Sequence, residues 1–174
     1  MSPEMIIAIS STVIALAALF VSIWQGILTR QHNKLSVMPR LRIDFHRAVE
    51  LISIKVLLVN KGTGPAIIRS MDYGVDKLML TGDPTIQMMA ALKKVDIPTG
   101  LCYGHFFYPD EVIAPGESVE LLHFPNIEPN NPTRAQIAKS LDRLTFKIRH
   151  ESIYKDKLEL EYSAPSEAAA LLPR

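Results

Sequence analysis

The stretch Met5–Leu28 reads MIIAISSTVIALAALFVSIWQGIL and contains no charged residue. A helix rises about 1.5 Å per residue, so a helix of this length reaches roughly 36 Å, enough to cross a hydrocarbon core of about 30 Å with some tilt. A buried helix of a soluble domain is rarely apolar on every face over such a length. The stretch therefore predicts a single transmembrane helix.

A cleaved signal peptide is the main alternative for an apolar segment at this position. Such a peptide begins with basic residues, has an apolar region of about 7–15 residues and ends in a small-residue cleavage site. This chain begins Met-Ser-Pro-Glu, without Lys or Arg ahead of the apolar stretch, and the stretch is longer than that of a signal peptide. We therefore expect a permanent anchor, preceded by a short extracytoplasmic N-terminus at residues 1–4.

The charges on either side of residues 5–28 predict the orientation of the helix. Glu4 is the only charged side chain ahead of it. Basic residues predominate behind it: Arg30, Lys34, Arg40, Arg42 and Arg47, against one acid, Asp44. Lys and Arg near helix ends favour the cytoplasm, and Trp24 lies near the same end, where an indole favours the membrane interface. We expect a single-pass protein of the inner (cytoplasmic) membrane with a cytoplasmic domain. Its basic neck, residues 29–38, either contacts anionic lipid headgroups or only determines this topology.

Small side chains recur along one face of the same helix. They follow one another at spacings of three and four residues, which aligns them in a stripe: Ala8, Ser11, Ala15, Ala18 and Ser22, continued by Gln25. In a bilayer, small residues let helix backbones approach closely, and Ser or Gln hydrogen-bond across the contact. The stripe favours a homo-oligomer formed through the helix, against the alternative that frequent Ala and Ser residues align by chance.

From Pro39 onward the pattern changes to that of short strands. Proline ends the helical region, and apolar residues then alternate with polar ones, which is the period of a strand. The strand-like segments are Leu41–Phe45, Ile52–Val59, Ala66–Ser70, Tyr73–Leu80, Tyr103–Tyr108, Ser118–Phe124, Leu144–Arg149 and Lys157–Tyr162. Two helical segments interrupt them, at Pro84–Lys94 and Pro132–Leu141. Short strands at spacings of about 8 to 12 residues indicate a sandwich or barrel over residues 39–163. We expect a flexible tail at 164–174.

Two turns carry a resemblance to a known kind of module. Val59-Asn-Lys-Gly-Thr-Gly-Pro-Ala-Ile67 and Val112-Ile-Ala-Pro-Gly-Glu-Ser-Val-Glu-Leu121 resemble matching turns of bacterial immunoglobulin-like modules. The order of helix, basic neck and β domain also resembles that of uncharacterised bacterial single-pass membrane proteins. The resemblance implies an N-terminal transmembrane helix and a mainly-β domain, an immunoglobulin-like sandwich of about seven strands with two short helical insertions. The helix at Pro132–Leu141 departs from a plain immunoglobulin sandwich and leaves the strand order open.

The side chains that could carry chemistry are dispersed. Cys102 and His105 have a spacing seen in metal and redox motifs, but zinc needs three or four ligands and a reactive thiol needs a lowered pKa. We expect a buried Cys102 and ordinary strand histidines at His123 and His150. A single cysteine also excludes an intramolecular disulfide.

Acidic and glycine-rich segments also favour structural interpretations. Asp110 and Glu111 are adjacent in a loop and should point apart, unlike a catalytic carboxylate pair. Gly62-Thr-Gly64 is not followed by the Lys and Ser or Thr of a phosphate loop and favours a turn. We therefore predict no catalytic residue, no metal site and no cofactor.

Aromatic residues gather after the cysteine. If Tyr103–Tyr108 is a strand, alternation places Phe106 and Tyr108 on one face and Phe107 on the other. Such residues usually fill a core, and a solvent-facing member would favour the binding of a ligand or partner.

Composition limits the class of protein. The chain has 174 residues and a net charge of +1, without the basic excess of a nucleic-acid-binding domain. Roughly 130 to 140 residues remain after the anchor, the size of one domain. We expect a non-enzymatic interaction or accessory module that is held in the lipid bilayer, self-associates through its helix and binds an unidentified protein partner. Two alternatives stay open: a signal-responsive, oligomerising membrane effector of the bacterial-defence kind, whose β domain senses a ligand or partner, and a membrane-bound enzyme.

Overall fold

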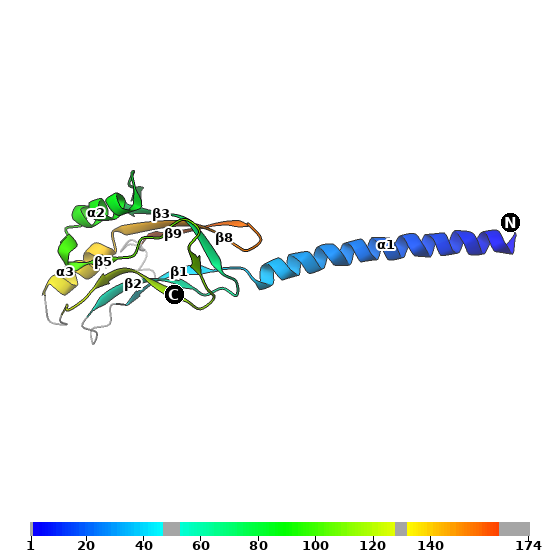
Figure 1. The fold of residues 1–174 in the computed structure, drawn as a ribbon, viewed down its shortest axis with the longest axis horizontal. Coiled ribbons are helices and arrows are strands. Elements are labelled where there is room, and N and C mark those ends of the chain that lie inside the picture. Colours follow the sequence, from blue (N-terminus) through cyan, green and yellow to red (C-terminus); the bar gives the residue numbers. More distant parts are fainter. Residues whose placement is uncertain (1, 47–52, 128–131, 164–174) are drawn as a thin grey trace, which may run out of the picture. The chain divides into compact units, whose positions relative to one another are not determined.

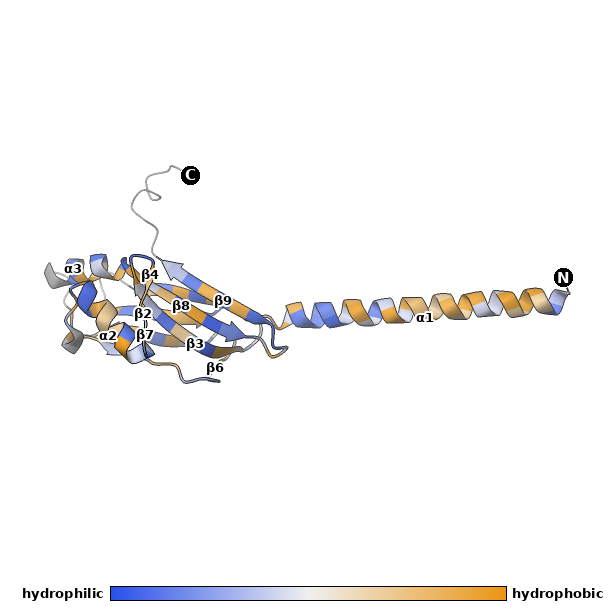
Figure 2. Ribbon diagram, turned by 90° about the horizontal axis from the view of Figure 1, so that it is seen from above, coloured by the Kyte–Doolittle hydropathy of each residue, from blue (hydrophilic) through white to orange (hydrophobic). Residues whose placement is uncertain are grey.

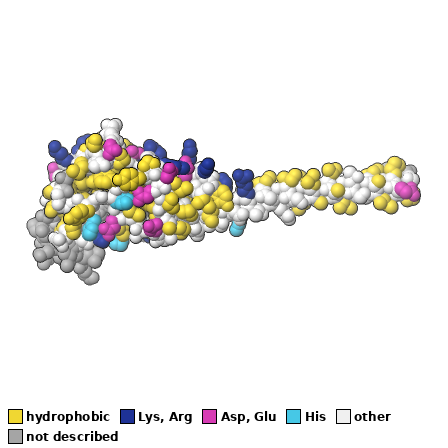
Figure 3. Space-filling model, in the orientation of Figure 1, with side chains coloured by type: hydrophobic (Ala, Val, Ile, Leu, Met, Phe, Trp, Pro, Cys, Tyr) yellow, Lys and Arg dark blue, Asp and Glu magenta, His cyan; other side chains and the backbone are white. Residues whose placement is uncertain are grey.

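The computed structural model describes residues 2–46, 53–127 and 132–163, and the chain divides into two compact units, Met1–Val37 and Met38–Arg174. The first unit is one helix, α1 (Pro3–Ser36), 34 residues long and without a buried residue. Figure 1 shows it unbroken, and Figures 2 and 3 show hydrophobic residues over much of its surface. As predicted, α1 is long and apolar enough to span a membrane, with a mean hydropathy of 2.5 over an 18-residue window.

The sequence at each end of α1 explains where the helix begins and ends. Pro3 lies in the first turn, where its missing N–H costs nothing, and Glu4 adds a favourable negative charge there. Lys34 has the matching sign for the last turn. The helix continues past Leu28 to Ser36, through most of the predicted neck, and ends shortly before Pro39.

The second unit is mainly β. Its elements, in chain order, are β1 (Leu41–His46), β2 (Ile54–Asn60), β3 (Ala66–Val75), β4 (Leu78–Met79), α2 (Pro84–Lys94), the 3-10 turn η1 (Thr99–Leu101), β5 (Tyr103–Gly104), β6 (Val112–Ile113), β7 (Ser118–Phe124), α3 (Pro132–Leu141), β8 (Leu144–Glu151) and β9 (Lys157–Ser163). Both helices have the predicted bounds. The predicted residues Arg47, Ile52 and the tail 164–174 lie outside the described residues.

The strands form two sheets around one core. Every pairing among the described residues is antiparallel. One sheet has the order β1-β2-β7-β5, and the other has the order β4-β3-β8-β9 with β6 also paired to β3. The first sheet contributes Ile54, Val56 and Leu58 to the core, and the second contributes Tyr73 and Phe146. Burial of every second residue in β2 explains the period of two in its sequence.

One boundary prediction is wrong because of a β-bulge. The predicted strands Ala66–Ser70 and Tyr73–Leu80 are largely one continuous strand, β3, which ends at Val75. Its pairing with β8 shifts register between Ile68 and Ser70. The extra residue interrupts the alternation of side chains, so the sequence resembles two strands where the chain forms one.

A buried asparagine organises the turn after β2. The Nδ2 group of Asn60 donates to the carbonyl oxygens of Gly64 (2.8 Å) and Ile113 (3.0 Å). Its Oδ1 atom accepts from the backbone N–H groups of Gly62 (3.0 Å) and Arg40 (3.2 Å). A Cβ atom on Gly62 would lie 2.4 Å from the Arg40 nitrogen, so only glycine fits. The glycine-rich segment is thus a turn, as predicted, and it fixes the start of β1.

Candidate functional site

The predicted helix-contact stripe lies on α1. Its members, all exposed in the single chain, are Ala8, Ser11, Ala15, Ala18, Ser22 and Gln25. The Ser11 hydroxyl donates to the carbonyl oxygens of Ile7 (2.9 Å) and Ala8 (3.0 Å), and the Ser22 hydroxyl donates to that of Ala18 (2.9 Å). Because a hydroxyl has one hydrogen, these serines keep only acceptor lone pairs for a neighbouring helix. The stripe therefore offers close backbone approach, with the Gln25 amide as both donor and acceptor.

The residues predicted to set membrane topology are divided between the two units. They are Trp24, Arg30 and Lys34 on α1, and Arg40 and Arg42 at the start of the β unit. Trp24 stacks on Phe20, with ring centroids 6.5 Å apart. Arg40 and Arg42 lie beside a groove of the β unit.

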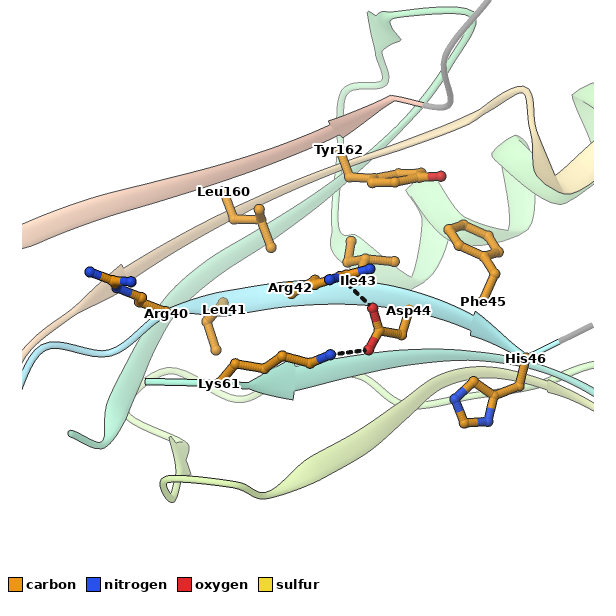
Figure 4. A pocket seen from close by; sticks show the side chains of 10 residues that line it. All are labelled: Arg40, Leu41, Arg42, Ile43, Asp44, Phe45, His46, Lys61, Leu160 and Tyr162. Atoms are coloured by element: carbon orange, nitrogen blue, oxygen red, sulfur yellow. Dashed lines mark ion pairs between the residues drawn. The ribbon is translucent and has the colours of Figure 1, made fainter. Parts of the chain in front are cut away.

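This groove, of about 800 Å³, runs along β1, and we call it the β1 groove. Its apolar lining comes from the end strands of the two sheets: Leu41, Ile43 and Phe45 from β1, and Leu160 and Tyr162 from β9. The rings of Phe45 and Tyr162 lie 5.1 Å apart and come together at one end of the groove in Figure 4. The β1 groove is therefore a side of the core along which the two sheets are not joined by a shared strand.

Charged side chains border the β1 groove: Arg40, Arg42, Asp44 and Lys61. The Asp44 carboxylate lies 2.6 Å from Arg42 Nε and 3.0 Å from Lys61 Nζ, the two ion pairs drawn in Figure 4. Burial acts to raise the pKa of the Asp44 carboxyl. The hydrogen bond from Lys61 and the charge of Arg42 together lower the pKa by more than burial raises it, so the pKa lies below its ordinary value. Asp44 is thus ionised at neutral pH. Because the border holds three cations, Arg40, Arg42 and Lys61, and this one carboxylate, it carries a net positive charge.

The cysteine and histidines do not form a reactive group. Cys102 is half-buried and not fully buried as predicted, and this partial burial raises the pKa of its thiol to about 11, which disfavours the nucleophilic thiolate. His105 Nε2 lies 2.9 Å from Glu111 Oε1, and His123 Nδ1 lies 3.2 Å from Glu120 Oε2. In the part of the chain that the structure describes, no three His, Cys, Asp or Glu side chains are grouped so that they could hold a metal ion.

The adjacent carboxylates of Asp110 and Glu111 have different partners. Asp110 pairs with Arg69, whereas Glu111 accepts from the backbone N–H of Tyr108 (3.1 Å) and contacts His105. The two groups stabilise the loop separately and do not form the facing pair that acid–base catalysis requires.

The aromatic segment differs from its prediction. Strand pairing ends at Gly104, so the expected alternation of Phe106, Phe107 and Tyr108 on two faces of a strand is wrong. Phe106 and Phe107 both pack against the core, whereas Tyr103 and Tyr108 are 70% and 77% exposed. Solvent-facing tyrosines are the observation that favours a binding surface in this segment.

Sequence reasoning missed most of the β1 groove. The spacing of Arg42 and Asp44 places both on one face of a strand, which was the available signal. Nothing in the sequence indicates that Leu160 and Tyr162 lie beside β1, because only the order of strands in the two sheets brings β9 there.

A scan of protein-family models and a search of curated proteins found no match for this chain. The proposed function therefore rests on α1, the β1 groove and the exposed surface of the β unit.

Proposed function

We propose that this protein is a membrane-anchored, non-enzymatic interaction module that self-associates through α1. The observation that carries the proposal is α1, which contains an apolar stretch long enough to span a membrane and has no buried residue. Leaving apolar surface in water costs about 25 cal/mol per Å², and a bilayer removes that cost. We extend the proposal to an immunoglobulin-like sandwich for the β unit, supported by two antiparallel sheets around one core.

We also propose that α1 spans the inner membrane with the β unit in the cytoplasm. Arg30 and Lys34 follow the apolar part of α1 within the same helix, whereas Glu4 is the only charged side chain before it. Lys and Arg retain a helix end on the cytoplasmic side. A phosphatase active only in the periplasm, fused to the C-terminus, should be inactive, and the same enzyme fused at the N-terminus should be active. Activity at the C-terminus would contradict this orientation.

The proposed contact between α1 helices is tested by filling the stripe. Ala15→Leu with Ala18→Ile adds bulk where backbones must approach, so oligomers in detergent should be lost. Val13→Ile with Ala17→Leu adds bulk to another face of α1 and is the matched control. The measurement is the mass of the full-length protein–detergent complex by light scattering. Equal masses for the stripe variant and the wild type would remove the helix contact from the proposal.

The β unit supplies the binding surface in this proposal. Tyr103 and Tyr108 are exposed, and the β1 groove combines an apolar lining with a positive border. A protein partner with apolar and acidic side chains fits this surface.

The second candidate is a signal-responsive membrane effector, favoured by the positive border of the β1 groove, where an anionic ligand would find Arg40, Arg42 and Lys61. Ligand binding would then promote clustering of α1 and perturb the membrane. Expression that is toxic to cells, and loss of toxicity in the stripe variant, would favour this candidate over the accessory module. Toxicity unchanged in that variant would count against it.

A further inference from the structure

The long outer edge of β3 is closed by neighbouring groups. The Ile68 N–H donates to the Glu111 carbonyl oxygen (2.8 Å), and the Tyr73 N–H donates to the side-chain oxygen of Gln87 (2.7 Å). The Leu80 N–H donates to the Tyr73 carbonyl oxygen (2.9 Å). A side chain of α2 and two loop segments thus occupy positions where a further strand would pair, which protects this edge.

β1 is also an end strand, and no strand among the described residues pairs with its side away from β2. The Arg40 carbonyl oxygen accepts from the Lys61 N–H (2.8 Å), so the backbone of Arg40 faces β2. Backbone groups of an antiparallel strand change direction from one residue to the next. Arg42 and Asp44 therefore face β2 as well, and the N–H and carbonyl groups of Ile43 between them point to the free side.

We propose that β1 pairs antiparallel with β1 of a second copy of this chain, about a two-fold axis at Ile43. In this register Arg42 of each copy lies opposite Asp44 of the other, so two opposite-charge pairs form across the strands. The two Ile43 residues lie opposite each other with their free backbone groups facing, as a hydrogen-bonded pair requires. Apolar residues stay on the inner face, and the two β1-containing sheets continue into one.

Neighbouring registers lack this complementarity. If the two-fold axis lies at Arg42, the Arg42 residues of the two copies lie opposite each other. If it lies at Asp44, the two Asp44 residues lie opposite each other. Like charges directly opposite each other are destabilising. The other long end strand, β9, is mismatched too, because pairing about its central residue, Leu160, sets Glu159 opposite Glu161. β1 is thus the long edge whose charge pattern is complementary to itself.

A contact of about five residues per strand is weak between freely diffusing proteins. The inference therefore rests on the proposed anchoring by α1, which confines the copies to one membrane and raises their effective concentration.

The register predicts a complementation experiment with the full-length chain in liposomes, read by energy transfer between C-terminal fluorescent tags. Arg42→Asp gives a strand with two acids, Asp44→Arg gives a strand with two bases, and each variant repels itself. In a mixture both opposite-charge pairs are restored between chains, while each chain still lacks its internal Arg42–Asp44 pair. We expect dimerisation about tenfold weaker for each variant alone and recovered in the mixture.

A second background separates this pairing from the helix contact. With Ala15→Leu and Ala18→Ile also present, energy transfer reads β1 pairing alone. Complementation that persists there supports the β1 contact whatever the outcome for the stripe. Variants that are folded by thermal unfolding, but whose mixture gives no more transfer than either alone in both backgrounds, would overturn the β1 contact and leave the anchor and stripe untouched.

Cross-linking gives an independent measurement. Opposite residues of a non-hydrogen-bonded pair have Cα atoms about 4.5 Å apart, within the range of a disulfide. Full-length Arg42→Cys and Asp44→Cys chains, each with Cys102→Ser, should form a cross-linked heterodimer when mixed in liposomes under oxidising conditions. Lys157→Cys and Glu161→Cys on β9 are the matched control. An equal yield for the β9 pair would mean unspecific collision and would overturn the proposal.

Discussion

Replacing Asn60 by alanine should destabilise the β unit by about 2–4 kcal/mol. The substitution removes the side-chain amide, so the Gly64 and Ile113 carbonyl oxygens lose their donor, Nδ2, and the Gly62 and Arg40 N–H groups lose their acceptor, Oδ1. A buried polar group without a partner costs about 1–3 kcal/mol. The two carbonyl oxygens are buried, whereas the N–H groups of Gly62 and Arg40 are partly buried and regain water. The two carbonyl oxygens contribute one such cost each, and water that partly rehydrates them reduces the sum to the stated range.

This loss corresponds to a lower Tm of roughly 8–15 °C for a domain of this size. All five tyrosines follow Pro39 and the one tryptophan, Trp24, lies in α1, so near-ultraviolet circular dichroism of tyrosine follows the β unit separately. Asn60→Asp keeps the acceptor but sets a buried carboxylate against the Gly64 and Ile113 carbonyl oxygens, so it should destabilise the β unit at least as much as alanine does. Thr63→Ala, at an exposed position of the same turn, is the matched control. A loss below about 1 kcal/mol for Asn60→Ala, equal to that of Thr63→Ala, would refute the argument from hydrogen bonding.

Three further outcomes follow from single residues. Gly62→Ala should destabilise the β unit, because its Cβ atom would lie 2.4 Å from the Met38 carbonyl oxygen and the Arg40 nitrogen; an unchanged urea midpoint would contradict this. Burial lowers the pKa of His150, so the unfolded chain binds a proton more readily, and stability should fall as the pH decreases below about 6.5. In urea titrations at pH 7.5 and 5, His150→Phe should lose less unfolding free energy between the two pH values than the wild type does. The same loss in both proteins would exclude His150 as the source of the pH dependence. The half-buried Cys102 thiol, with a pKa of about 11, should react slowly with iodoacetamide at pH 8 until urea unfolds the chain, and rapid labelling of the folded protein would contradict the raised pKa.

The helices and central strands were predictable from the sequence because their signals are local. Residues 5–28 are apolar on all faces, and Pro84–Lys94 begins with a proline in its first turn after the capping residue Asp83. In β2 the alternation follows directly from burial of one face. Such features depend on neighbouring residues alone, which a single sequence displays in full.

The features that were missed depend on contacts between distant segments. The bulge in β3 accompanies a backbone hydrogen bond from Asp110 to Ile68 (2.9 Å), and nothing in residues 66–70 indicates it. The strand predicted at Tyr103–Tyr108 pairs over only two residues with β7. The β1 groove needs Tyr162 beside Phe45, a neighbour set by the order of strands. In the stripe, the sequence identified the small residues but not that Ser11 and Ser22 donate their hydrogens within α1.

The connection between the two units has a mechanical consequence. α1 runs unbroken to Ser36, and the carbonyl oxygen of Met38 already accepts from the Thr63 N–H (3.2 Å) in the β unit, so Val37 alone separates two fixed segments. Two Cα–Cα steps link Ser36 to Met38, so the β unit begins within about 8 Å of the end of α1. If α1 spans a bilayer as proposed, this short tether limits how far from the membrane the β unit can find a partner. Glycines inserted at Val37 would lengthen the tether and widen that range while leaving the anchor and both sheets intact.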